Sequence, residues 1–91
     1  MAEATSEDTL LEFPCRFSIK AMGNNTPQLK DTVADLVRPH VAQLDDSQIS
    51  TRVSAKGNYL SVNVVFTATS KAQLDSIYRA LSSHPDIKMA L

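Results

Sequence analysis

Five basic residues alternate with apolar residues in three extended segments, and this spacing is the clearest chemical signal in the sequence. They are Arg16, Lys20, Arg52, Lys56 and Lys88. Successive side chains of a β-strand point to opposite faces, so we expect all five on one face of a sheet. Ammonium and guanidinium groups gathered there would attract small anions or an acidic protein surface.

A second interpretation of these cations stays open at the level of the sequence. An uncovered sheet face needs polar residues, and the long stems of Lys and Arg cover such a surface well. Lysine near a sheet edge also discourages aggregation. The five cations therefore predict either a binding face or a face that is only solvated.

Four segments alternate between apolar and polar residues and are predicted strands: residues 15–22, 49–56, 59–66 and 87–91. In the last of these, Ile87, Met89 and Leu91 are expected to point inward. Between the second and third strands, Gly57-Asn58 suits a two-residue turn. That turn would pair Lys56 with Tyr59, Val53 with Val62 and Ile49 with Phe66.

Two helices are predicted between the strands. Thr26 is a good N-cap and Pro27 suits the first helical position, while Pro39 should end this first helix near Arg38. The second helix should begin after the N-cap Ser70, with Gln73 completing a capping box.

The order βαββαβ predicts an α+β ferredoxin-like sandwich, with two helices on one face of a four-stranded antiparallel sheet. The expected strand order is 4-1-3-2, which leaves strands two and four as open edges and offers a route to a homodimer. We expect one domain over residues 10–91, preceded by a disordered acidic tail at residues 1–9.

The loop Gly23-Asn24-Asn25-Thr26 is a second candidate site. It joins the first strand to a helix N-terminus, where free N–H groups favour a carboxylate or phosphate. The same residues also suit an ordinary strand-to-helix loop, because Gly and Asn readily adopt turn conformations.

Other classes of site lack support in the sequence. Cys15, His40 and His84 do not have metal-ligand spacing, and the Cys-x-x-Cys of copper carriers is absent from the first loop. No nucleophile, base and acid stand at a catalytic spacing, so we expect neither an enzyme nor a cofactor. Only Tyr59 offers an outward ring on the strands that bind RNA in related folds, while Phe17 should be buried, and this disfavours nucleic-acid binding.

Composition bounds the cellular setting. The chain has 91 residues, a net charge of −1 and one cysteine, which fits a reducing compartment. The acidic N-terminus does not resemble a signal peptide, and no apolar run approaches the ~20 residues needed to cross a bilayer. We expect a cytoplasmic protein that does not bind membranes.

Two segments together resemble the YbeD-like family of small bacterial proteins. They are Leu-Glu-Phe-Pro at residues 11–14 with Phe17 and Lys-x-Met-Gly at 20–23, and Ser-x-Lys-Gly-x-Tyr-x-Ser at 54–61. The closing Ile-Lys-Met-Ala-Leu is also similar. The resemblance implies a ferredoxin-like domain similar to ACT regulatory domains, with no established activity. It also places Lys20, Lys56 and Tyr59 at family motif positions.

These observations favour a regulatory or adaptor domain that binds an acidic partner protein through its open sheet face. Lys20, Arg52, Lys56 and Tyr59 would make the contact. The alternative is an ACT-like sensor of a small carboxylate, held by residues 23–26 at a dimer interface. Nucleic-acid binding is the third hypothesis.

Overall fold

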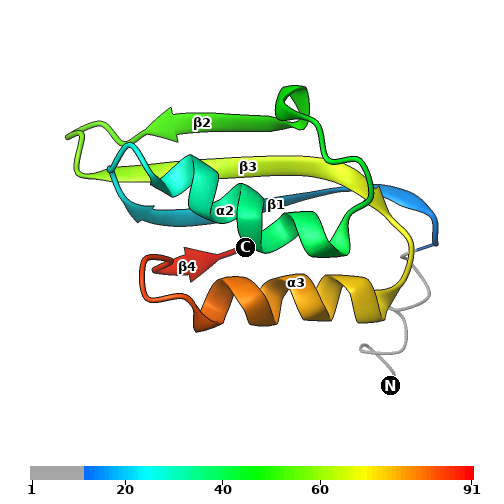
Figure 1. Cartoon of the computed structure of the whole chain (residues 1–91). Coiled ribbons are helices and arrows are strands. Elements are labelled where there is room, and N and C mark those ends of the chain that lie inside the picture. Colours follow the sequence, from blue (N-terminus) through cyan, green and yellow to red (C-terminus); the bar gives the residue numbers. More distant parts are fainter. Residues whose placement is uncertain (1–11) are drawn as a thin grey trace, which may run out of the picture.

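The computed structural model describes residues 12–91, so the predicted tail at residues 1–9 lies outside the described part. The elements are β1 (Cys15–Asn24), α2 (Leu29–Val37), the 3₁₀ turns η1 (Arg38–His40) and η2 (Asp46–Gln48), β2 (Ile49–Val53), β3 (Tyr59–Ala68), α3 (Lys71–Ser83) and β4 (Met89–Ala90). Figure 1 shows them along the chain.

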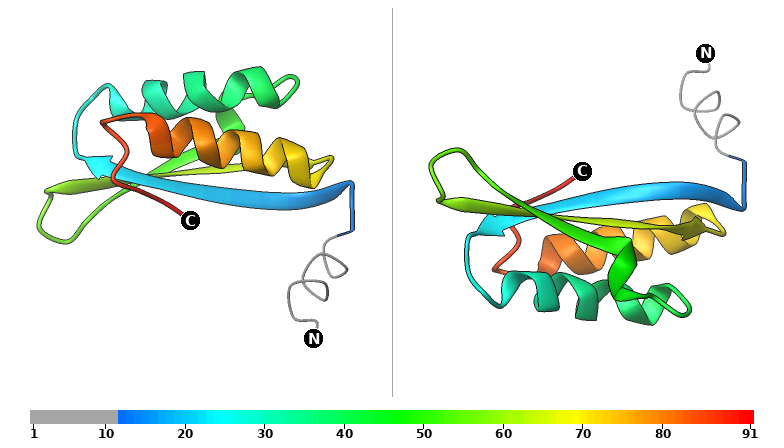
Figure 2. Two further views of the ribbon diagram at one scale, coloured as in Figure 1. Left: turned by 90° about the horizontal axis from the view of Figure 1, so that it is seen from below. Right: turned by 90° about the horizontal axis from the view of Figure 1, so that it is seen from above.

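The four strands form one antiparallel sheet in the order β2-β3-β1-β4. This order is the predicted 4-1-3-2 read from the other edge. Both helices lie on the same face of the sheet, and in both views of Figure 2 no helix of residues 12–91 covers the opposite face. The predicted ferredoxin-like fold is therefore confirmed.

The core lies between the helices and the covered face of the sheet. It is built from every second residue of the central strands and from one stripe of each helix. The sheet supplies Ile19, Ala21, Val62, Val64 and Phe66, and the helices supply Leu29, Val33, Val37, Leu74, Ile77 and Leu81. Burying a large apolar side chain of this kind contributes about 1.5–3 kcal/mol relative to leaving it exposed.

The predicted N-cap of the first helix is wrong. α2 begins at Leu29, after Gln28, and no side chain caps it. β1 continues to Asn24, two residues beyond its predicted end, so Thr26 and Pro27 are used for the turn. There the Thr26 carbonyl accepts a hydrogen bond from the Leu29 N–H at 3.3 Å. The predicted end is right, since α2 stops just before η1, which contains Pro39.

Ser70 caps α3 as predicted, because its Oγ accepts a hydrogen bond from the Gln73 N–H at 3.1 Å. The Gln73 side chain does not complete the capping box. Its Oε1 accepts from the N–H of Thr69 at 2.7 Å, and its Nε2 donates to the His40 carbonyl at 2.8 Å. Gln73 therefore ties the start of α3 to η1.

The predicted two-residue hairpin turn is wrong by two positions in register. Val53 pairs with Leu60 and Ile49 with Val64, and residues 54–58 form the connection. The longer loop is closed at Ser54, whose carbonyl accepts from the Gly57 N–H at 2.9 Å and whose Oγ accepts from the Tyr59 N–H at 3.1 Å. Because the shift is even, the residues of β2 and β3 keep their predicted faces.

The predicted orientation of the last strand is also wrong. Met89 and Leu91 are exposed, and only Ile87 of the three is buried. Met89 pairs with Met22 on the open face, so Ala90 points to the core beside Ala21. Ile87 precedes β4, and the alternation of the strand therefore does not extend back to it.

Gly23, near the end of β1, is required because the connection between α3 and β4 passes close to it. A Cβ atom at this position would overlap the backbone oxygen of Asp86 and lie 3.2 Å from the Leu29 side chain. Gly23→Ala should lower the free energy of unfolding by about 2 kcal/mol or more, because a backbone atom cannot move aside cheaply. Urea denaturation followed by circular dichroism measures this change.

Gly57→Ala is the matched control. Gly57 has φ of +79° but open space around its Cβ position, so the substitution should cost only about 1 kcal/mol of backbone strain. A larger loss for Gly57→Ala than for Gly23→Ala would contradict the packing argument.

Candidate functional site: an open basic sheet face

The uncovered face of the sheet carries three predicted cations on its strands. Arg16 lies opposite Thr67, Lys20 opposite Asn63 and Arg52 opposite Ser61, and all three are exposed. None of the four strands contains an Asp or Glu residue. We call this surface the open basic face.

Three of the cations outside this face are paired with acids. Lys30 lies 3.0 Å from Asp46, Arg38 lies 3.0 Å from Asp35, and Lys71 lies 3.4 Å from Asp75. Among residues 12–91, Arg16, Lys20 and Arg52 form no ion pair of this kind. Their positive charge is thus not neutralised by the described acids, although the chain as a whole has a net charge of −1.

Exposed apolar side chains stand among these cations. Tyr59 is 47% exposed, Met89 51% and Leu91 61%. Tyr59 lies opposite Asn24 in the β1–β3 pairing. Leu91 lies opposite Lys20, since the two residues exchange backbone hydrogen bonds of 2.8 and 3.0 Å. The open basic face thus carries Arg, Tyr and Met side chains, which are residue types enriched in protein interfaces.

Two adjoining hollows lie on the β2 side of the open basic face. One of about 270 Å³ is lined by Met22, Arg52, Val53, Ser54, Ala55, Tyr59 and Ser61. The other, of about 390 Å³, is lined by Lys20, Ser50, Thr51, Arg52, Ser61 and Asn63. Arg52 and Ser61 line both, so a guanidinium group stands where the hollows meet.

The other two predicted cations are placed elsewhere. Lys56 belongs to the hairpin loop after β2 and is exposed beyond the end of that strand. Lys88 lines a pocket at the end of the sheet, next to the start of α2. Of the five cations predicted on the open face of the sheet, three therefore lie on strands of that face.

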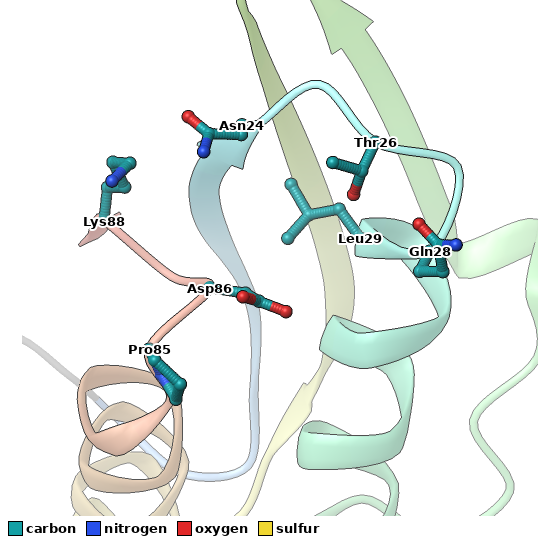
Figure 3. A pocket seen from close by; sticks show the side chains of 7 residues that line it. All are labelled: Asn24, Thr26, Gln28, Leu29, Pro85, Asp86 and Lys88. Atoms are coloured by element: carbon teal, nitrogen blue, oxygen red, sulfur yellow. The ribbon is translucent and has the colours of Figure 1, made fainter.

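Two residues of the predicted ligand loop, Asn24 and Thr26, line the pocket at the end of the sheet. It measures about 230 Å³ and is lined by Asn24, Thr26, Gln28, Leu29, Pro85, Asp86 and Lys88. Figure 3 shows the Asp86 side chain directed toward the start of α2. A carboxylate ligand would meet the carboxylate of Asp86 as well as the ammonium of Lys88. Carboxylate sensing by this loop stays a prediction.

Asn25, also in the predicted ligand loop, has a structural contact that sequence reasoning missed. Its Nδ2 donates to the Gly57 carbonyl at 3.0 Å, and its backbone N–H donates to the Asn58 carbonyl at 3.0 Å. The two loops that carry the family-like motifs are thereby joined. The Asn-Asn pair indicated bonding to backbone within its own loop, but it gave no signal for a partner 32 residues further along the chain.

The two resolved pKa shifts lie away from the open basic face. The pKa of Asp45 is lowered mainly by the hydrogen bond from the Ser47 hydroxyl, and the pKa of Tyr78 is raised by burial. Within residues 12–91, no three His, Cys, Asp or Glu side chains are grouped to hold a metal ion. In the same residues, no helix has the length and apolar character to span a membrane.

Comparison with known proteins places this architecture in a family. Residues 8–91 match the family described as "Protein of unknown function (DUF493)". A UPF0250 protein from Paraburkholderia phytofirmans is 45% identical over 84 residues, which is 92% of this chain and 94% of the relative. The chain belongs to this family. The resemblance to YbeD-like proteins seen in the sequence is confirmed.

Other UPF0250 relatives match along the whole chain. The protein from Janthinobacterium sp. is 44% identical and that from Neisseria meningitidis serogroup C is 42% identical, each over 100% of both chains. The solution structure of HP0495 from H. pylori has a TM-score of 0.67, with 15% identity over 89% of this chain and 85% of its own. At that identity the likeness shows a shared fold.

Asn25→Ala should loosen the hairpin loop in this UPF0250 protein. Removing the bond to Gly57 should cost about 1 kcal/mol and speed amide hydrogen exchange at residues 57–59. Asn24→Ala is the control, because Asn24 is exposed and no side-chain hydrogen bond to a described residue holds it. Equal exchange rates in the two variants would show that the Asn25 bond does not hold the loop.

Proposed function

We propose that this chain is a non-enzymatic regulatory or adaptor domain that binds an acidic partner protein through the open basic face. The observation that carries the proposal is the segregation of charge. Three of the four cations on the helix side, Lys30, Arg38 and Lys71, are paired with acids, whereas Arg16, Lys20 and Arg52 project from strands that contain no carboxylate.

The chemistry of the face supports a protein partner over a small ligand. Tyr59 can serve as an aromatic anchor beside the hollow that Met22 and Arg52 also line. The cations around it would steer an acidic surface into place and fix its orientation. Lys56, on the adjacent loop, would extend the contact.

A double variant with two reversed charges tests the proposal. Lys20→Glu/Arg52→Glu should lower recovery of the partner at least about tenfold, because it places like charges against an acidic surface. The measurement is a quantitative pull-down from extract of the native cells, followed by titration of the captured protein.

The matched control is Lys71→Glu/Arg79→Glu on α3, which changes the net charge equally but leaves the open basic face intact. This control should retain the partner. The proposal fails if both double variants, shown by circular dichroism to be folded, bind equally well or lose the partner equally.

Tyr59→Ala tests the apolar part of the same contact. It should weaken partner binding by about tenfold or more, as truncation of an anchoring tyrosine commonly does. The loss should persist at 0.5 M NaCl, whereas the effect of Lys20→Glu/Arg52→Glu should shrink there, since salt screens exposed charges.

Thr67→Ala is the control on the same face, because Thr67 is exposed and lies opposite Arg16, far along β3 from Tyr59. Isothermal titration at both salt concentrations provides the comparison. If Thr67→Ala lost as much affinity as Tyr59→Ala, Tyr59 would not be a specific anchor for the partner.

A further inference from the structure

The outer edge of β2 presents backbone groups that are free to pair. β2 stands at one edge of the sheet and, among residues 12–91, pairs only with β3. The hydrogen bond from the Ser54 N–H to the Tyr59 carbonyl, at 2.9 Å, fixes which residues face β3. By antiparallel alternation, Thr51 and Val53 turn their N–H and C=O groups outward. Ile49 turns its C=O outward, while its N–H donates to the Asp46 carbonyl.

This edge has little of the usual protection against pairing. β2 contains no Pro, and its sequence Ile-Ser-Thr-Arg-Val carries one charge. Its residues after Ile49 are exposed on both sides, with Val53 51% exposed. In Figure 1, β2 lies beyond both helices at the edge of the sheet. Native proteins normally blunt such an edge, so an unprotected one is a template for another strand.

We propose that the occupant of this edge is β2 of a second copy of the chain, paired antiparallel about a two-fold axis at Thr51. This register overlaps all five residues of the strand. It places Ile49 opposite the partner's Val53 on the helix side of the sheet. On the open side, Ser50 lies opposite the partner's Arg52. Apolar residues thus meet apolar ones, and Arg52 faces a neutral residue.

The charges beyond the strand ends agree with this symmetry. Asp45 and Asp46 precede β2, and the Asp46 side chain is 83% exposed. Lys56 follows β2 in the hairpin loop. Antiparallel pairing brings each Lys56 loop to the acidic turn of the other copy, so the edge is self-complementary, as a two-fold interface requires. Face-to-face pairing of two open basic faces would instead bring like charges together.

The pairing would join two four-stranded sheets into one and set the open basic faces side by side. The hollow lined by Ser50, Thr51 and Arg52 adjoins the edge and would gain a wall from the other copy. A contact of five residues per chain is small, so we expect a weak dimer that dissociates in the micromolar range or above.

Sedimentation velocity of the full chain from about 10 μM to 1 mM tests the dimer. Wild type should shift from monomer to dimer across this range. Thr51→Pro should remain monomeric, because it removes an outward N–H without breaking the ladder to β3. Thr51→Val keeps that N–H and should dimerise like wild type.

Charge reversal gives a second test that does not depend on the folding of Thr51→Pro. Lys56→Asp and Asp46→Lys should each weaken the dimer about tenfold by creating two repulsive contacts. An equimolar mixture of the two variants should dimerise again, since each reversed charge then meets its opposite. Thermal unfolding of each variant checks that losing the Lys30–Asp46 contact leaves the fold intact.

The outcomes decide the proposal independently of the acidic partner. A monomer at 1 mM overturns it, and so does a dimer that survives Thr51→Pro and both charge reversals. Restoration in the mixture supports direct contact between the two ends of β2. Neither result depends on whether Lys20→Glu/Arg52→Glu loses its partner.

Discussion

The antiparallel pairing of β1 with β3 is the constraint on which the rest of the structure depends. It runs from Cys15 opposite Ala68 to Asn24 opposite Tyr59 and forms the centre of the sheet. It fixes which side chains enter the core, and the edge-to-face contact of Phe17 with Phe66, with ring centroids 6.2 Å apart, lies within it. The same register determines the residues of the open basic face.

The two connections that cross the sheet place both helices on one side, and this asymmetry creates the candidate site. Apolar stripes on α2 and α3 cover one face, so the other must be compatible with water. Solvation alone would be served by Ser, Thr and Asn. The strands instead carry cations and no carboxylate, and the face also exposes Tyr59, Met89 and Leu91. Solvation of the face does not require either feature.

Alternation in the sequence was sufficient to predict the sheet and most of its faces, because side-chain parity depends only on the period of two. It was insufficient for features set by individual hydrogen bonds. Ser54 lengthens the hairpin loop through its Oγ, which shifts β2 by two residues and moves Lys56 off the strand. Lys88 was misplaced because the short β4 takes its orientation from pairing with Met22, which its own sequence does not reveal.

The family-like motifs acquire distinct physical explanations once the fold is known. Gly23 admits the backbone of Asp86, Gly57 adopts a positive φ, and Ser54 closes the hairpin loop. Asn25 then joins the two loops through Gly57. These contacts account for the turn residues, but none of them involves the side chain of Lys20 or Tyr59. Structural needs therefore explain the glycines of the motifs, whereas the exposed side chains of Lys20 and Tyr59 are left for the proposed contact with a partner protein.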